Sequence, residues 1–272
     1  MGVGSHTDAG CFFCKTIDGL SKYVYNCFCG VINLFWTVIL WILLGLLGLL
    51  AAYILLVLIS CLFADRHRVY DKNSKYFRFL LNSSTGLAIK LIRIKIKISG
   101  LDKIPDGRFL LVSNHRSKFD PILSWYAFRK YDLAFISKYE NFEVPIFGRI
   151  IRKCCFMGID RDNPRKAAKT IIQSVKLIKN NECSVAVYPE GTRNYGEGLL
   201  PFHNAVLKIA QKAEVPIVVL TVKGTYEIQK NFPLRKSTVN LDVLDVIPAR
   251  RVKESTTAQL GSEIAAAMLK NL

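Results

Sequence analysis

The fold is decided by the stretch Phe109–Lys130, which reads FLLVSNHRSKFDPILSWYAFRK. Its first five residues, Phe109–Ser113, predict a buried β-strand, because they form a short apolar run without any charge. Asp120 followed by Pro121 is typical of a helix start, with a capping side chain before a proline at the first helical position. A strand that leads through a short polar loop into a helix is the building unit of an α/β fold.

The same alternation of strand and helix patterns continues through the chain. It is clearest at Asn163-Pro164, which predicts the start of a helix that continues to Asn180. The predicted strands are 92–98, 109–113, 133–137, 156–160, 184–188, 217–223 and 239–247, and the predicted helices are 120–130, 163–180, 204–213 and 255–272. We therefore expect an α/β fold with a central, mostly parallel sheet flanked by helices.

A long apolar segment precedes this region. No Asp, Glu, Lys or Arg stands between Lys22 and Asp65, and the centre of the segment, Val31–Ala64, reads VINLFWTVILWILLGLLGLLAAYILLVLISCLFA. A helix needs about 20 apolar residues to cross a bilayer. The segment therefore predicts an N-terminal transmembrane helix or a helical hairpin that turns near Gly45 and Gly48, and we favour the single span.

The charge divides the chain at the same place. The formal net charge of +17 lies on residues 65–272, because residues 1–64 hold equal numbers of acidic and basic side chains. We expect residues 1–64 to be a membrane anchor with a cysteine-rich leader and residues 65–272 to form one domain. The basic excess predicts an anionic partner, either a lipid surface or a nucleic acid.

Flanking cations predict the orientation of the anchor. More of them follow the apolar segment than precede it, and the positive-inside bias then places residues 65–272 on the cytoplasmic side. The cations after the segment are Arg66, Arg68, Lys72, Lys75 and Arg78, against Lys15 and Lys22 before it.

The eight cysteines form two groups. The first, in a C-x2-C and C-x-C arrangement, consists of Cys11, Cys14, Cys27 and Cys29. Such spacing is found in zinc sites, but phenylalanine neighbours favour interfacial or lipid-modified thiols, and we expect no metal site. The second group stands in apolar runs and predicts buried core residues: Cys61, Cys154, Cys155 and Cys183.

A candidate base follows the strand 109–113. His115 stands at the carboxyl end of this strand, where open α/β sheets place their ligands. Asp120, five residues later, can turn back and accept a hydrogen bond from the imidazole Nδ1, which leaves Nε2 as a base. Asp120 is also expected to cap the following helix.

A second polar cluster follows the strand 184–188 and reads YPEGTR from Tyr188 to Arg193. Gly191 lets the backbone approach a ligand, the Thr192 hydroxyl can donate, and the Arg193 guanidinium can bind phosphate through two hydrogen bonds. Alone, this pattern is more typical of a surface turn with a solvated arginine. Beside His115, it predicts an anion-binding loop.

Together the two clusters resemble motifs of the glycerolipid acyltransferase family, most closely those of the 1-acylglycerol-3-phosphate acyltransferases. The resemblance runs from about residue 92 to about residue 220. It rests on Asn114-His115 with Asp120, on residues 138–140 and 158–161, on residues 189–193 and on residues 215–217. Asn194 and Val219 depart from the family pattern, which often has serine and proline there.

The resemblance implies a membrane-bound O-acyltransferase of phospholipid synthesis. Such an enzyme moves a fatty acyl group from acyl-CoA or acyl carrier protein to the free hydroxyl of lysophosphatidate, and needs no cofactor or metal. His115 would be the catalytic base and Asp120 its partner. The resemblance places the acceptor at Lys138, Arg161, Glu190, Gly191, Thr192 and Arg193.

Other functions stay open beside this one. Within the family, the acceptor could be glycerol-3-phosphate or another lysolipid. A non-catalytic tether to anionic lipid would explain the anchor and the charge, but would leave both polar clusters without a role. A nucleic-acid tether would need aromatic residues among the cations. The basic strand 92–98 contains only isoleucine between its cations, so we expect no nucleic acid partner.

Overall fold

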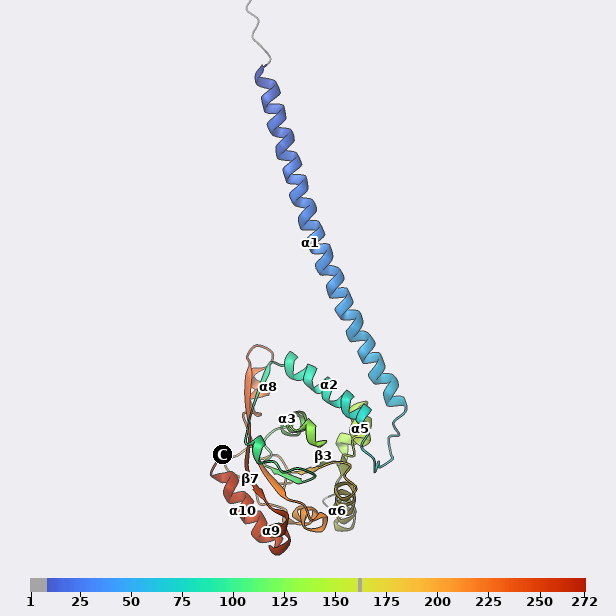
Figure 1. Cartoon of the computed structure of the whole chain (residues 1–272), viewed down its shortest axis with the longest axis vertical. Coiled ribbons are helices and arrows are strands. Elements are labelled where there is room, and N and C mark those ends of the chain that lie inside the picture. Colours follow the sequence, from blue (N-terminus) through green and yellow to red (C-terminus); the bar gives the residue numbers. More distant parts are fainter. Residues whose placement is uncertain (1–8, 161–162) are drawn as a thin grey trace, which may run out of the picture. The chain divides into compact units, whose positions relative to one another are not determined.

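The structure is a computed structural model that describes the backbone of residues 9–160 and 163–272, and the side chains of residues 33–160 and 163–272. The chain divides into two compact units, one up to Ile59 and one from Ser60 to Leu272 (Figure 1).

The first unit is formed by helix α1 (Ala9–Leu62), which ends shortly after the boundary between the units. Its part from Asn33 to Leu62 is long and apolar enough to cross a membrane. Large apolar side chains are exposed along it, whereas a core helix of a soluble protein would bury them. The helix continues without a turn through Gly45 and Gly48, as the single-span alternative predicts. The four leader cysteines lie outside the residues whose side chains are described.

The second unit contains a seven-stranded sheet with the strand order β1-β7-β6-β2-β5-β3-β4. The strands are β1 (Ile94–Ser99), β2 (Leu110–Ser113), β3 (Ala134–Ser137), β4 (Met157–Gly158), β5 (Val185–Val187), β6 (Ile217–Lys223) and β7 (Ser237–Ile247). Every neighbouring pair is parallel except β6 and β7, which are antiparallel. The predicted central, mostly parallel sheet is confirmed.

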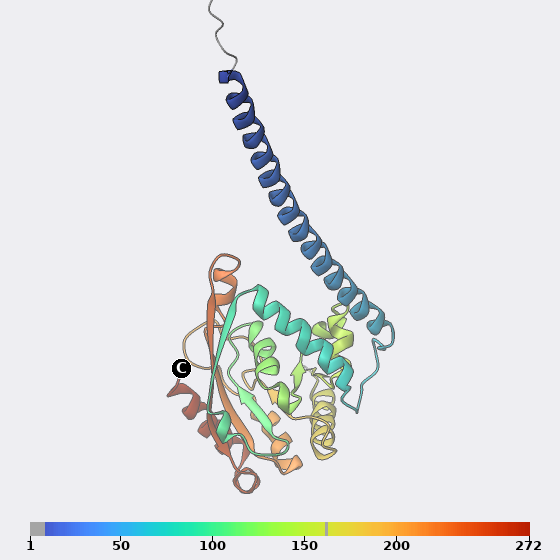
Figure 2. The ribbon, with the colours of Figure 1, turned by 45° about the horizontal axis from the view of Figure 1, so that its top comes forward.

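Helices flank this sheet, with α2 and α3 on one side and α10 on the other (Figures 1 and 2). They are α2 (Lys75–Leu91), α3 (Phe119–Ala127), α4 (Glu140–Glu143), α5 (Phe147–Lys153), α6 (Pro164–Lys179), α7 (Lys208–Ala213), α8 (Glu227–Asn231), α9 (Ala249–Glu254) and α10 (Thr257–Leu269). Because both faces are covered, the central strand β2 is buried along its whole length.

Helix α6 shows how the local sequence sets an element. The Asn163 side chain accepts a hydrogen bond from the backbone N–H of Lys166 at 3.1 Å, and Pro164 occupies the first turn. The helix ends at Lys179, where its C-cap is Asn180, so the predicted helix 163–180 is confirmed. Such a side-chain cap stabilises a helix by about 1 kcal/mol.

Helix α2 was not predicted, and it changes the interpretation of two cations. The Arg78 side chain is buried and donates to the backbone carbonyls of Leu133 at 2.6 Å and Cys154 at 2.8 Å. Lys75 pairs with the Asp132 carboxylate at 2.6 Å. Arg78 therefore holds α2 to the segments that precede β3 and β4 and does not belong to a cationic surface next to the anchor, whereas the Lys75 side chain stays largely exposed.

The second group of cysteines lies in the core, as predicted: Cys61, Cys154, Cys155 and Cys183 are all buried. Burial raises the pKa of the Cys154 thiol to about 11, because the thiolate would lose its hydration. Cys154 is therefore a neutral packing residue at physiological pH.

Candidate active site

The candidate site is assembled by four adjacent strands of the sheet. β6, β2, β5 and β3 are neighbours in this order and run parallel, so their carboxyl ends meet at one edge. The residues that follow these strands are Thr225 after β6, His115 after β2, Tyr188 after β5 and Lys138 after β3. Such an edge is where open α/β sheets bind ligands.

His115 and Asp120 form the expected pair. The His115 Nδ1 lies 2.9 Å from the Asp120 Oδ2, and the carboxylate is fully buried. The same oxygen accepts the backbone N–H groups of Arg116 at 2.6 Å and Ser117 at 2.7 Å, while Oδ1 accepts the Thr225 hydroxyl at 2.5 Å. Asp120 thus acts as an acceptor, so Nδ1–H of His115 donates and Nε2 carries the free lone pair.

These contacts correct the expected role of Asp120 at the helix start. Helix α3 begins at Phe119, and its N-cap residue Lys118 makes no side-chain capping bond. Asp120 lies inside the first turn, and its carboxylate turns back to the loop that carries His115. The capping role is therefore absent, while the contact with His115 is present.

A stack of aromatic rings supports the imidazole. The Tyr188 ring lies 4.3 Å from the His115 ring, centroid to centroid, at an interplanar angle of 20°. The Phe135 ring stacks on Tyr188 at 5.9 Å. Burial, together with the negative charge of Asp120, raises the pKa of Tyr188 well above its usual value. The phenol is therefore neutral, and its ring restricts the orientation of the His115 imidazole.

Glu190 lies beneath the site and fixes its loops. Its Oε1 accepts the backbone N–H of His115 at 2.8 Å, and its Oε2 accepts the backbone N–H of Leu200 at 2.9 Å. The residue is only 3% exposed and is not part of the cavity wall. The family resemblance places Glu190 with the acceptor, whereas the contacts make it a positioning residue for the two loops.

The site opens into a cavity of about 480 Å³. Five predicted site residues line it together: His115, Lys138, Gly191, Thr192 and Arg193. Gly191 has a positive φ of 71°, a conformation that glycine adopts without strain. Arg161 lies outside the described residues.

Sequence reasoning missed Lys118 and the apolar wall of this cavity. Lys118 lies between His115 and Asp120 in the sequence, and its side chain adds a fourth basic group to the lining. Its position between His115 and Asp120 was the sequence signal from which its place in the cavity lining could have been predicted. The apolar wall includes Ile122, Trp125, Phe135, Phe147 and Phe156. A cavity with both a base and cations, and with a broad apolar surface, suits a ligand with a phosphate and an acyl chain.

No cysteine whose side chain the structure describes lines this cavity. Within the same residues, no group of three or more His, Cys, Asp or Glu side chains is placed to hold a metal ion. Among the described residues that line the cavity, His115 carries an imidazole, which can act as a general base.

Comparison with known proteins agrees with these features. The acyltransferase family model matches residues 95–223, which include the loops that carry His115 and Arg193. A probable 1-acyl-sn-glycerol-3-phosphate acyltransferase of Mycoplasma pneumoniae is 29% identical over 212 residues, covering 74% of this chain and 77% of the relative.

Two further relatives are called 1-acyl-sn-glycerol-3-phosphate acyltransferase. That of Haemophilus influenzae is 28% identical, covering 64% of this chain and 74% of the relative. That of Limnanthes douglasii is 31% identical, and the matched segment covers 52% of this chain and half of the plant protein.

The crystal structure of the 1-acyl-sn-glycerophosphate acyltransferase PlsC from Thermotoga maritima shares the fold. It superposes with a TM-score of 0.61 at 22% sequence identity, covering 79% of this chain and 85% of that chain. The matched family model, the named relatives and the His115–Asp120 pair at the sheet edge agree with one another, and residues 95–223 match the acyltransferase domain.

Proposed function

We propose that the protein is a membrane-bound 1-acylglycerol-3-phosphate O-acyltransferase, which esterifies the free hydroxyl of lysophosphatidate to give phosphatidic acid. The observation that carries this proposal is the cavity that is lined by His115, hydrogen-bonded to Asp120 at 2.9 Å, together with Thr192 and Arg193. The names of the relatives support the same acceptor.

The reaction needs one base and two substrates bound together. Nε2 of His115 accepts the proton of the acceptor hydroxyl while the hydroxyl oxygen attacks the carbonyl carbon of the acyl thioester. The C–S bond then breaks, the thiolate leaves with the proton from the imidazolium, and the new C–O bond is the ester of phosphatidic acid. The Asp120 carboxylate stabilises the transient imidazolium. Holding both substrates in one cavity lowers the entropic part of the barrier.

The remaining lining suits the two ends of the substrates. The Arg193 guanidinium can bind the acceptor phosphate through two charge-assisted hydrogen bonds, and Lys118 and Lys138 add further positive charge to the cavity. The apolar wall, with Trp125 and Phe147, suits an acyl chain. The acyl donor in this proposal is acyl-CoA or acyl carrier protein, and no resident cofactor is expected.

The membrane part of the proposal concerns helix α1. We propose that Asn33–Leu62 spans the bilayer and that residues 65–272 lie on its cytoplasmic side. After the correction for Arg78, cations such as Arg66, Arg68 and Lys72 still follow the span. The formal net charge of +17 supports attraction to anionic lipid.

The test uses the full chain in phosphatidylcholine nanodiscs, supplied with oleoyl-CoA and lysophosphatidate. Release of free thiol and formation of phosphatidic acid should rise together in a one-to-one ratio. His115→Ala should lower the rate by about 10²–10⁴-fold, because a positioned base contributes this much. Circular dichroism would check that this variant is folded.

An acceptor and donor panel tests the finer assignments. Glycerol-3-phosphate and lysophosphatidylcholine replace the acceptor, and oleoyl acyl carrier protein replaces the donor. A higher kcat/KM for one of the other acceptors would move the assignment within the family. Thiol release without any acylated product would indicate a thioesterase, and the absence of turnover with every pair would favour a non-catalytic lipid tether.

A further inference from the structure

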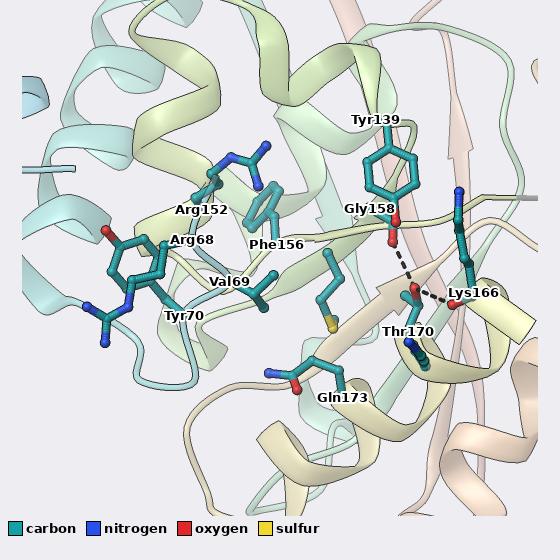
Figure 3. A pocket seen from close by; sticks show the side chains of 12 residues that line it. Arg68, Val69, Tyr70, Tyr139, Arg152, Phe156, Gly158, Lys166, Thr170 and Gln173 are labelled. Atoms are coloured by element: carbon teal, nitrogen blue, oxygen red, sulfur yellow. Dashed lines mark hydrogen bonds between the residues drawn. The ribbon is translucent and has the colours of Figure 1, made fainter. Parts of the chain in front are cut away.

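A second cavity of about 370 Å³ lies outside the site already described. Its walls come from the segment 68–70, from the end of α5 with the following strand β4, and from helix α6 (Figure 3). Four of its lining residues are cations: Arg68, Arg152, Lys166 and Lys169. Phe156 contributes to both cavities, but His115 and Arg193 line only the first.

Arg152 is the most enclosed of these cations. Its side chain is 13% exposed, and among the described residues its buried Nε has no hydrogen-bond partner. One guanidinium nitrogen lies 3.8 Å from the exposed carboxylate of Glu143, and the guanidinium stacks over the Phe142 ring at 4.8 Å. A guanidinium that is this buried and this weakly paired is suited to receive an anion.

The charge balance of the cavity is positive. Lys166 pairs with Asp160 at 3.0 Å, and Arg68 lies near the carboxylates of Asp65 and Asp71, so these two cations are partly compensated. Within the part of the chain that the structure describes, Lys169 forms no ion pair. The side chains of Arg152 and Lys166 lie on different sides of the cavity (Figure 3), which leaves room between them for a ligand.

The rest of the lining is apolar or amphipathic. Val69, Phe156 and Met157 contribute apolar surface, and Tyr70 and Tyr139 contribute aromatic rings. A free phosphate ion would gain nothing from this surface. A phospholipid would place its phosphate among the cations and its glycerol and first methylenes on the apolar part.

The position in the chain points to the same ligand. Arg68 follows the last residue of the candidate span, Leu62, by only six residues. Six residues reach at most about 20 Å when fully extended. If α1 spans the bilayer, as proposed above, the wall formed by Arg68 and Tyr70 stays close to the lipid headgroups.

We propose that the cavity between residues 68–70, β4 and α6 binds the phosphate headgroup of an anionic phospholipid, at a site separate from that of the acceptor. The site would hold a membrane lipid that is neither substrate nor product. Its occupancy couples the domain to anionic membranes through specific contacts, in addition to the general attraction of the net charge.

Lysine footprinting on the full chain tests this proposal. The protein in phosphatidylcholine nanodiscs, with or without a minor fraction of phosphatidylglycerol, is treated with an acetylating reagent, and peptides are read by mass spectrometry. Lys179 is the internal control, because it is exposed on the same helix but does not line the cavity. Phosphatidylglycerol should slow acetylation of Lys169 roughly threefold relative to Lys179, which corresponds to about two-thirds occupancy.

Charge-matched variants separate the site from the general surface potential. Arg152→Gln and Arg68→Gln should each remove most of the protection of Lys169, whereas Arg165→Gln, on α6 but outside the cavity, should retain it. Arg68 is exposed, so its variant keeps the test valid if Arg152→Gln lowers the Tm.

Three results would overturn the proposal. Equal slowing at Lys169 and Lys179 would mean a diffuse surface effect, and equal effects of Arg152→Gln and Arg165→Gln would mean the same. Full protection of Lys169 by inorganic phosphate in pure phosphatidylcholine would assign the site to a free anion. Because phosphatidylglycerol takes no part in the proposed acyl transfer, the footprint result does not depend on the enzyme assay.

Discussion

The Glu190 carboxylate accepts the backbone N–H of His115 at 2.8 Å, and this contact joins the loop after β5 to the loop after β2. The backbone carbonyl of His115 in turn accepts the backbone N–H of Asn194 at 2.7 Å. His115 is therefore held by its backbone as well as by its ring, and the same contacts fix the loop after β5, for which we propose phosphate binding, to the loop after β2.

Glu190→Gln should destabilise the domain and lower the turnover. The amide offers one acceptor oxygen, whereas the native carboxylate accepts from both His115 and Leu200, so one buried N–H would lose its partner. Such a loss costs about 1–3 kcal/mol. The Tm of the domain and the kcat of the reaction should both fall. An unchanged Tm would show that the carboxylate does not hold the two loops together.

Asp120→Asn should lower activity while largely retaining the fold. The amide oxygen can accept from His115 and from the two backbone N–H groups, and the amide NH2 can donate to the Thr225 hydroxyl, which is able to accept. Only the negative charge that supports the imidazolium is lost, so we expect a decrease in kcat of about 10²–10⁴-fold.

Thr225→Val is the matched control for this variant. It removes the hydroxyl donor to the Asp120 Oδ1 and leaves the charge in place. We expect a smaller decrease in kcat and a lower Tm. A decrease in kcat as large as that of Asp120→Asn would show that the geometry of the carboxylate, and not its charge, limits the reaction.

The pair at the sheet edge was predictable because its determinants are local. Asp120 lies five residues after His115, and a loop of this length can turn back on itself. Helix α6 was predictable for the same reason, since Asn163 and Pro164 set its start within two residues. Glu190 was not, because whether a side chain points into the cavity or beneath it depends on packing from other segments.

That Lys138 and Arg193 line one cavity could not be predicted from the sequence, because it depends on the order of the strands in the sheet. β3 follows β2 in the sequence, yet β5 lies between them in the sheet, and this insertion brings the loop with Arg193 next to the loop with Lys138. A run of apolar strands does not specify its own order. The burial of Arg78 is a second example, because its acceptors at Leu133 and Cys154 lie far along the chain.

Tyr188 should act through its ring and not through its hydroxyl. Tyr188→Phe retains the stack on His115, so kcat should stay within about twofold of the wild type, whereas Tyr188→Leu should lower it by about fivefold, as the loss of an aromatic pair worth about 1 kcal/mol suggests. Burial raises the pKa of Tyr188, so the phenol stays protonated through alkaline pH. The pH–rate profiles of the wild type and Tyr188→Phe should therefore coincide up to about pH 10. A separate alkaline limb in the wild type would contradict this.

The exact position of a truncation should decide whether the domain is stable. A chain of residues 60–272 retains the hydrogen bond of 2.6 Å between the hydroxyls of Ser60 and Tyr76, and the Cys61 carbonyl that accepts from Arg149 at 2.6 Å. A chain that starts at residue 65 loses both and should have a lower Tm. We expect the longer chain to bind anionic vesicles at low salt and to be released at about 0.5 M salt, where the Debye length is only a few ångströms. Vesicle binding that is unchanged by salt would indicate apolar insertion of the domain itself.

The last prediction concerns what Arg193 recognises. Its guanidinium is exposed at the cavity and lies 5.7 Å from the Tyr195 ring centroid, so its hydrogen-bonding edge remains available to a ligand. Arg193→Lys keeps the charge but loses the two parallel donors, so it should be partly impaired, and Arg193→Ala should be severely impaired. The loss should appear mainly in kcat/KM for lysophosphatidate.

A neutral acceptor turns this into a test of the phosphate contact. The wild type should strongly prefer lysophosphatidate over monoacylglycerol, and Arg193→Ala should remove most of that preference while barely changing the rate with monoacylglycerol. Lys118→Gln provides the comparison, because Lys118 lines the same cavity but presents a single ammonium group. We expect Lys118→Gln to weaken the preference less than Arg193→Ala does. If Arg193→Ala slows both acceptors equally, Arg193 holds the loop or the acyl donor, and the acceptor phosphate must be bound by Lys118 and Lys138 instead.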